Sequence, residues 1–315
     1  MINYREMINQ NVIVASKKIN KYIRKTPFER SAMISDLIGA DVWLKMENQQ
    51  HTGSFKFRGA INKMLSLSES ERESGIYAAS TGNHGAAVAY ACQLLKVPCI
   101  IYVPENSSQA KLINMKNFGA EIVVHGKDCM DGELKAREVA NNTGGIYLSP
   151  YNDLEVVAGQ GTIGKEIESQ CNGLDSIIVS VGGGGLISGV GGYLKSIWPD
   201  IEVMAASPEN HAVMIKSLEV GEIIKINPVP TLSDGTAGGV EDQPPAEEFE
   251  DQPPPPGRHF AHQASYAAVL ESYARVRKPA SAARSFRSRC GLQGQCADRA
   301  ARQAQSDNTN VILPR

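Results

Sequence analysis

The sequence lacks the features that mark a disulfide framework, a zinc site or a membrane span. Only six of its 315 residues are cysteine, none forms a CxxC pair, and no histidine pair stands near them at zinc-finger spacing. Such cysteines are typical of buried or idle thiols in a reducing compartment. No apolar run approaches the ~20 residues that cross a bilayer, and the N-terminus has no continuous apolar core of the signal-peptide type. We therefore expect a cytoplasmic protein without a metal site.

Charge of one sign is also scarce, since the formal net charge is only -2. This balance gives no electrostatic reason to expect nucleic acid or an anionic membrane as a partner. Hydrophobic residues make up 42% and charged residues 21%, which is typical of a globular protein. A chain of 315 residues is too long for one small core, so we expect two packed units.

What the sequence does contain, up to residue 240, is a regular alternation of short apolar segments and helical segments. Strands are predicted at 41–46, 75–79, 97–103, 121–125, 145–148, 176–181 and 202–206. Helices are predicted at 57–67, 86–95, 109–118, 130–141, 160–170 and 188–197. This alternation is typical of βαβ units, so it predicts an α/β fold with parallel sheets flanked by helices. Ligands bind such sheets beyond the carboxyl ends of the strands.

The composition changes abruptly after Val240. Residues 1–240 hold 16 Lys and 6 Arg, whereas residues 241–315 hold 1 Lys and 9 Arg, together with half of the 16 prolines. EDQPP occurs at 241–245 and again at 250–254. This Pro/Glu-rich stretch predicts an extended or disordered chain, because it has too little apolar surface to offset chain entropy. Short helices are expected near 265–276 and 298–305, and a strand only at 310–313.

Four glycines, Gly182 to Gly185, follow the predicted strand at 176–181 and lead into a helix. Without Cβ atoms, their backbone N–H groups can approach a phosphate, and the helix dipole favours an anion. The dinucleotide fingerprint GxGxxG is not met, because Ser188 stands where its last glycine would be, and no Walker-type GK[ST] follows. The loop therefore indicates a phosphate site without a nucleotide, or else a tightly packed turn.

Lys56 stands between Phe55 and Phe57 at the predicted start of a helix. Apolar surroundings disfavour the ammonium form of a lysine, which frees its amine for Schiff-base chemistry. On composition alone, such a lysine is more often a surface residue whose stem lies along apolar groups.

The third motif is STGNHG at 80–85, directly after another predicted strand. Its short polar side chains and the free N–H groups of the helix that follows can bind a carboxylate or a ring hydroxyl. The alternative is an ordinary capped helix start, and His84 alone is more often a structural histidine than a base.

In their order along the chain, SFKFRGA, STGNHG and SVGGGGLISG resemble motifs of the fold-type-II pyridoxal-phosphate enzymes. This family includes threonine and serine dehydratases, serine racemase and hydroxyectoine-utilisation dehydratases. GQGTIGKEI at 159–167 and SDGTAGGVE at 233–241 are further similar stretches. The resemblance covers residues 5–241. It implies a tryptophan-synthase-β-like fold with a large domain (1–74 and 151–241), a small domain (75–150) and an atypical tail (242–315).

The resemblance also implies roles for the motif residues. Lys56 would carry pyridoxal 5'-phosphate as a Schiff base and then move the Cα proton of the substrate. Phe55 and Asn83 would hold the cofactor ring. The cofactor phosphate would be bound by Gly182, Gly183, Gly184, Gly185 and Leu186. The substrate carboxylate would be bound by Ser80, Thr81, Asn83 and His84. By analogy, the protein would form a homodimer.

The activity that this resemblance implies is β-elimination of water and ammonia from L-threonine or L-serine, giving a 2-keto acid. Racemisation is the alternative. Thr81 aligns with the serine that serves racemases as the second acid, and its added methyl group stiffens the side chain, so we rank dehydration first. Ser207 aligns with a carboxylate of the family's cation site and is a poor ligand for a hard cation.

Nothing in 242–315 matches the end of the family's large domain, which supplies the residue that bonds the pyridine nitrogen. We interpret this tail as the product of a changed reading frame, or else as an unrelated interaction segment. A chain without that part would be a catalytically degenerate relative, which is a second hypothesis for function. A nicotinamide dehydrogenase is disfavoured, because the dinucleotide fingerprint is absent.

Overall fold

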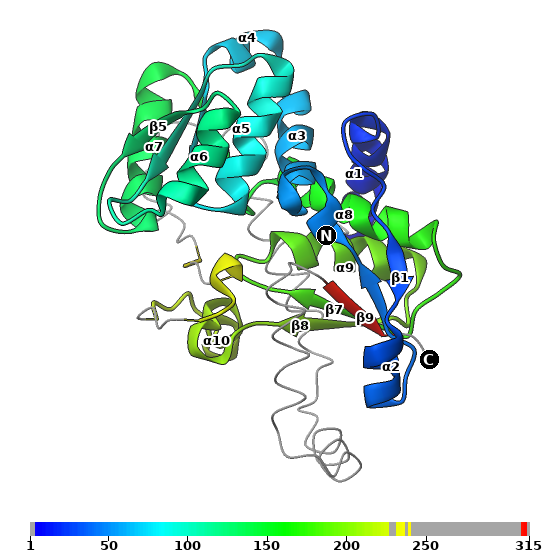
Figure 1. Ribbon diagram of the computed structural model, residues 1–315. Coiled ribbons are helices and arrows are strands. Elements are labelled where there is room, and N and C mark those ends of the chain that lie inside the picture. Colours follow the sequence, from blue (N-terminus) through cyan, green and yellow to red (C-terminus); the bar gives the residue numbers. More distant parts are fainter. Residues whose placement is uncertain (1–3, 227–230, 237–238, 241–309, 314–315) are drawn as a thin grey trace.

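The computed structural model describes residues 4–226, 231–236, 239–240 and 310–313, whose strands form two sheets (Figure 1). The order of the first sheet is β5-β4-β3-β6, and its strands are β3 (Ile76–Ala79), β4 (Cys99–Val103), β5 (Glu121–Val124) and β6 (Ile146–Tyr147). The order of the second is β1-β2-β9-β7-β8, and its strands are β1 (Phe28–Arg30), β2 (Trp43–Lys45), β7 (Ser176–Ser180), β8 (Glu202–Ala206) and β9 (Asn310–Leu313).

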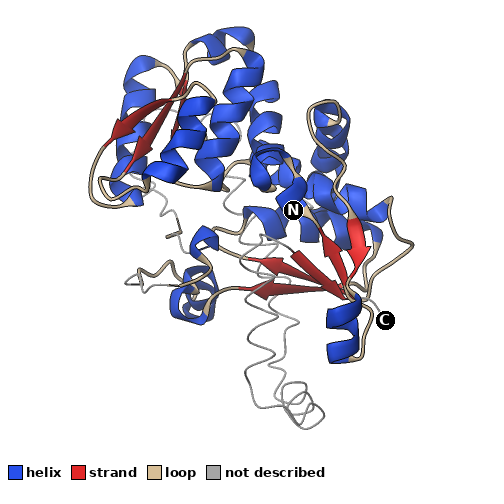
Figure 2. Ribbon diagram, in the orientation of Figure 1, coloured by secondary structure: helices blue, strands red, loops and turns tan. Residues whose placement is uncertain are grey.

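Helices flank both sheets (Figure 2). Those before the first sheet are α1 (Tyr4–Ile19), α2 (Ala32–Ile38), α3 (Lys56–Ser66) and α4 (Glu69–Glu73). Within and after it come α5 (Asn83–Leu95), α6 (Gln109–Asn117), α7 (Cys129–Thr143), α8 (Leu154–Glu168), α9 (Gly185–Ile197) and α10 (Val213–Val220). Within the described part of the chain, none of the helices is both long and apolar enough to cross a membrane.

All strand pairs of the four-stranded sheet are parallel. Because side chains alternate along a strand, Ile76 and Ala78 of β3 point into one core, which they share with α3 and α5. Tyr77 points to the other face, where it packs with Ala136 and Ala140 of α7. Both faces of this sheet are thus covered by helices, as an α/β fold requires.

The five-stranded sheet is mixed rather than purely parallel. β7 and β8 are parallel, whereas β9 runs antiparallel to β7 and to β2, and β2 runs antiparallel to β1. β7 carries the apolar run that predicted a buried strand, and Ile177 and Val179 lie in the core with residues of α1, α8 and α9. These three helices pack together over one face of the sheet (Figure 1).

Helices α3, α8 and α9 touch at glycines. A Cβ on Gly159 of α8 would lie 2.5 Å from the carbonyl oxygen of Arg58 in α3. A Cβ on Gly189 of α9 would lie 2.2 Å from the carbonyl oxygen of Val157 and 2.7 Å from the backbone nitrogen of Gly161, both in α8. The backbones of the three helices are therefore in direct contact, which fixes the spacing from α3 to the start of α9.

The predicted alternation of strands and helices from 41 to 206 is confirmed, with boundaries that shift by a few residues. The larger differences are of two kinds. α8 begins at Leu154 and α9 at Gly185, earlier than predicted, and the elements that were not predicted are α1, α2, α4, α10 and β1. The signal for α1 was present, since its buried residues Ile8, Val12, Ala15 and Ile19 recur at helical spacing.

Part of the predicted tail lies outside the described residues. The extended stretch after 241 and the two short helices at 265–276 and 298–305 belong to that part. The strand expected at 310–313 is β9, which lies between β2 and β7. The division of the chain into domains stays a prediction.

We predict that Gly189→Ala lowers the free energy of unfolding by about 1–3 kcal/mol, because its Cβ meets backbone atoms that cannot rotate away. Gly132→Ala is the matched control. Gly132 is also a buried glycine inside a helix, but the nearest atom to its added Cβ is 3.6 Å away. The control should be neutral or stabilising by about 0.5–1 kcal/mol. Urea denaturation measures both, and equal losses would contradict the packing of α8 on α9.

Candidate active site

The three predicted motifs meet at one short segment, Leu148 to Tyr151, which follows β6. Lys56 Nζ donates a hydrogen bond of 2.8 Å to the carbonyl oxygen of Pro150. The His84 ring contacts the carbonyl oxygen of Leu148 at 2.9 Å. The Tyr151 ring packs so closely on Gly183 that a Cβ there would lie 2.4 Å from it. Residues far apart in the sequence thus surround a single stretch of backbone.

Lys56 is the first residue of α3, as the sequence predicted for the start of a helix. Its Nζ also lies 5.4 Å from the centre of the Phe55 ring. Burial lowers the pKa of Lys56 to about 8. A substantial fraction of the side chain is therefore a neutral amine near physiological pH, which is the nucleophilic and basic form.

His84 is buried and neutral. Burial, with a smaller contribution from the charge of Lys56, lowers the pKa of His84 to about 3. A carbonyl oxygen only accepts hydrogen bonds, so Nε2 must carry the proton that it donates to Leu148. The His84 ring therefore carries no positive charge, and its Nε2 is already bonded to Leu148.

The STGNHG loop joins β3 to α5 at the carboxyl edge of the four-stranded sheet. Gly82 precedes α5 and has no side chain to cap it, so the first N–H groups of this helix are free of side-chain partners. The Ser80 hydroxyl accepts a hydrogen bond of 3.2 Å from the Gly82 backbone. Such a helix start attracts a carboxylate.

The next loops along the same edge form a cavity of about 350 Å³ beside this motif. It is lined by Thr81 and by Pro104, Asn106, Ser107, Ser108, Lys127, Asp128 and Cys129. β3, β4 and β5 are parallel, so the loops at their carboxyl ends meet at the same edge. Thr81 is thus reachable by a small solute.

The glycine loop joins β7 to α9. Gly184 has a φ of 87°, in the left-handed region that glycine tolerates best, and α9 begins at Gly185 without a side-chain cap. A Cβ on Gly185 would lie 2.8 Å from the Tyr151 carbonyl oxygen. The loop therefore presents backbone N–H groups at a helix N-terminus, and its neighbour Tyr151 follows the residue that binds Lys56.

Comparison with known proteins identifies this arrangement. Residues 19–282 match the family described as pyridoxal-phosphate dependent enzymes. The chain belongs to this family. The match continues past residue 241, where the resemblance seen in the sequence ends. The predicted fold class and the predicted cofactor family are both confirmed.

Two curated relatives are named as enzymes that act on threonine. The chain is 39% identical to the L-threonine ammonia-lyase of Thermotoga maritima over 228 residues, which are 72% of this chain and 57% of that protein. It is 39% identical to the catabolic L-threonine dehydratase TdcB of Escherichia coli K12 over 225 residues, 71% of this chain and 68% of that one. The match thus spans less than two thirds of the Thermotoga relative.

Solved structures give the same fold. Maize serine racemase superposes with a TM-score of 0.74 at 30% identity, over 84% of this chain and 74% of that one. The processed form of threonine deaminase isoform 2 from Solanum lycopersicum gives a TM-score of 0.70 at 34% identity, over 74% and 68% of the two chains.

The residues of this pyridoxal-phosphate family member fit the cofactor on their own geometry. The amine of the half-buried Lys56, whose pKa is lowered to about 8, suits the link to the cofactor aldehyde, and the uncapped N–H groups at the start of α9 suit its phosphate. The individual roles predicted for Phe55, Asn83, Leu186 and the other motif residues stay predictions. No sequence motif indicated Pro150 or Tyr151, because a backbone carbonyl that binds a lysine and a ring that packs on a glycine have no characteristic sequence pattern.

We predict that Lys56→Met raises the free energy of unfolding of the cofactor-free protein at pH 7 by about 1–3 kcal/mol. This gain is smaller than the free energy that corresponds to the whole pKa shift, because the variant also loses the hydrogen bond to Pro150. Below pH 8 the folded chain must bury an ammonium, and this cost disappears as the pH rises toward 10.5. The gain should therefore be full below pH 8 and shrink above it.

Urea denaturation between pH 6 and 10 measures this gain. The matched control is Lys116→Met, which replaces an exposed lysine at the end of α6. If both variants showed the same dependence on pH, the burial of the Lys56 ammonium would not be its cause.

Proposed function

We propose that the chain is a pyridoxal-phosphate-dependent ammonia-lyase that converts L-threonine, L-serine or both to a 2-keto acid and ammonia. The observation that carries this proposal is the Lys56 amine, which has a pKa of about 8 and lies where the three motifs meet. The names of the two curated relatives support threonine as a substrate. The expected homodimer and the expected cytoplasmic location stay predictions.

The substrate carboxylate would bind at the start of α5. The N–H groups there, which have no side-chain cap, would be joined by the Ser80 and Thr81 hydroxyls and by the Asn83 amide. The helix dipole adds a favourable field for one negative charge. Fixed donors of this kind hold the amino acid in one orientation, which lowers the entropic part of the barrier.

The Cα–H bond of the bound amino acid would then point toward Nζ of Lys56. In its neutral form Nζ takes the Cα proton, and bound pyridoxal phosphate supplies the electron sink for the negative charge left on Cα. The β-hydroxyl takes up one proton and leaves as water, and the proton that Nζ removed from Cα balances this uptake. The released enamine is hydrolysed, so the water lost is regained, and threonine gives 2-oxobutanoate and ammonia while serine gives pyruvate and ammonia.

Racemisation is the second candidate, and the likeness to maize serine racemase favours it. It needs a group that returns a proton to the opposite face of Cα. Thr81 would be that group, since it lies in the loop proposed to hold the carboxylate. Dehydration needs no such group, so it demands less of this site.

We expect the cofactor-loaded protein to release keto acid and ammonia in equal amounts from L-threonine or L-serine. Lys56→Ala should lower kcat by about 10²–10⁴ or more, because the general base is lost. Lys116→Ala, at an exposed lysine, is the control and should keep the wild-type rate.

The measurement is the coupled determination of both products, with chiral analysis of the remaining amino acid. D-serine formed from L-serine without keto acid would favour the racemase. A protein that holds the cofactor but forms neither product would contradict both activities and favour a degenerate relative.

A further inference from the structure

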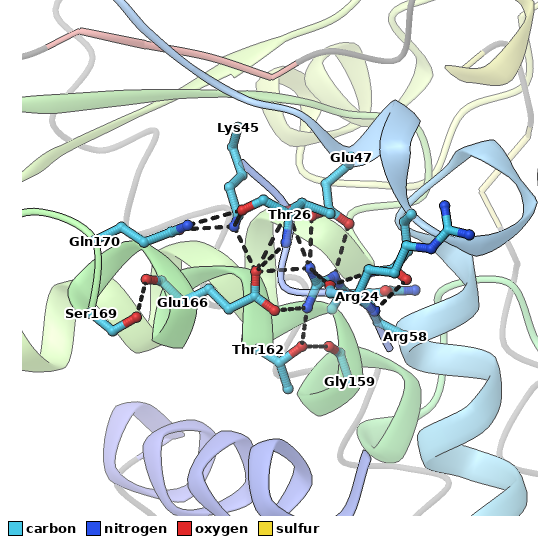
Figure 3. A network of polar contacts seen from close by, with 12 residues as sticks. Arg24, Thr26, Lys45, Glu47, Arg58, Gly159, Thr162, Glu166, Ser169 and Gln170 are labelled. Atoms are coloured by element: carbon cyan, nitrogen blue, oxygen red, sulfur yellow. Dashed lines mark hydrogen bonds and ion pairs between the residues drawn. The ribbon is translucent and has the colours of Figure 1, made fainter. Parts of the chain in front are cut away.

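Arg58, two residues after Lys56 in the first turn of α3, is fully buried between two carboxylates (Figure 3). Its guanidinium lies 2.8 Å from Glu47 and 2.7 Å from Glu166. Burial alone would disfavour its charge, but the charges of Glu47 and Glu166 outweigh burial and raise the pKa of Arg58. None of the proposed chemical steps uses this residue.

The ion pairs continue into a larger cluster, which we call the Arg58 cluster: Arg58, Glu47, Glu166, Lys45, Thr26, Thr162 and Gln170. Lys45 Nζ lies 2.6 Å from Glu166 and donates to the Thr26 carbonyl and to Gln170. Two positive and two negative groups therefore balance one another. They come from β2, from the short segment that follows it, from α3 and from α8 (Figure 3).

The opposite side of α3 packs into the core beneath the four-stranded sheet through Phe57, Ala60, Ile61 and Met64. Hydrophobic contacts are not directional, and the glycine contact between α3 and α8 sets their spacing but not their rotation. The later turns of α3 have polar contacts of their own with α8, because Asn62 donates to Glu155 and Lys63 lies 2.6 Å from Asp153 at the N-cap of α8. A guanidinium held by two carboxylates is directional, because its N–H groups form a rigid fork.

The rotation of α3 matters for Lys56. At the start of α3, Lys56 Nζ reaches Pro150, which lies just before α8. Two residues further along the same turn, Arg58 is bound to Thr162 and Glu166 on α8 itself. α8 in turn packs on α9, which begins at Gly185, the last residue of the glycine loop. The position of Nζ relative to that loop thus depends on how α3 is held against α8.

We propose that Arg58, held by Glu47 and Glu166, is a positioning residue that fixes the orientation of the first turn of α3 and so places Lys56 Nζ opposite the glycine loop at 182–185. This inference rests on the proposed role of Lys56 as the residue that links the cofactor.

The test separates binding of the cofactor from its link to Lys56. Pyridoxine 5'-phosphate has no aldehyde, so its affinity reports the phosphate and ring sites alone. With pyridoxal 5'-phosphate, borohydride reduction followed by mass analysis of the Lys56 peptide reports the link, measured as a function of pH.

Arg58→Lys keeps the charge but replaces the fork by a single ammonium, which cannot bridge Glu47, Glu166 and Thr162 together. We expect little change in pyridoxine 5'-phosphate affinity and a fall of about tenfold or more in the equilibrium constant of the link, since small misplacements have large effects on reacting groups. The pH of half-maximal link should rise, because an Nζ moved out of its buried place regains an ordinary lysine pKa.

Thr162→Val is a milder change to the same cluster, because it removes one hydrogen bond to Arg58 and no charge, and it should give a smaller effect in the same direction. It keeps the test decisive if Arg58→Lys fails to fold. Arg30→Lys is the matched control, because Arg30 forms an exposed ion pair of 2.7 Å with Asp41 and should show wild-type behaviour.

The proposal is overturned if both cofactor affinities fall together with the unfolding midpoint, or if the pH of half-maximal link stays constant across the series. Neither measurement involves turnover. If the cofactor link to Lys56 depends on Arg58 but no keto acid forms, only the proposed lyase activity is refuted. If keto acid forms but the link does not change when Arg58 is replaced, only this inference is refuted.

Discussion

Lys45 and Arg58, two cations without exposed surface, are buried beside Glu47 and Glu166 at the junction of α3, α8 and β2. Taking such groups from water is costly, and their mutual attraction offsets that cost only while every charge keeps its partner. Desolvation still lowers the pKa of Lys45, although Glu166 opposes it. Loss of any one of these four charged groups would leave an uncompensated buried charge. The Arg58 cluster therefore ties α3, which carries Lys56, to α8, on which α9 packs directly after the glycine loop.

The second constraint on the site is a stretch of backbone. Carbonyl oxygens of Leu148 and Pro150 bind His84 and Lys56, and Tyr151 fills the space that Gly183 and Gly185 leave open. These contacts use the end of β6, a strand of two residues at the edge of its sheet. A short strand is sufficient because its role is to bring this segment to the carboxyl edge, beside the loop that follows β3.

The C-terminal region of this chain differs most from the rest of the sequence. The family match reaches residue 282, although the composition changes after residue 240. β9 at 310–313 pairs with both β2 and β7, so it joins two parts of the large sheet that are otherwise not neighbours. The hypothesis of a changed reading frame stays untested, and the role of the tail in activity is part of what the turnover assay decides.

The sequence by itself determined the elements and the motifs, because both depend on local patterns. Apolar runs at strand length, helical spacing and glycines after a strand carry their meaning wherever they occur, and they located Lys56, the STGNHG loop and the glycine loop. The choice between a reactive and a surface Lys56 could not be made locally, because it depends on burial by residues far along the chain.

Only the tertiary structure decided how these parts are held together. It placed His84 as a neutral, buried donor, brought Pro150 and Tyr151 to the site, and buried Arg58, a residue type that sequence alone assigns to the surface. The physical reason is that desolvation and ion pairing depend on partners more than a hundred residues apart, such as Arg58 and Glu166 at 2.7 Å. No local pattern records such a contact.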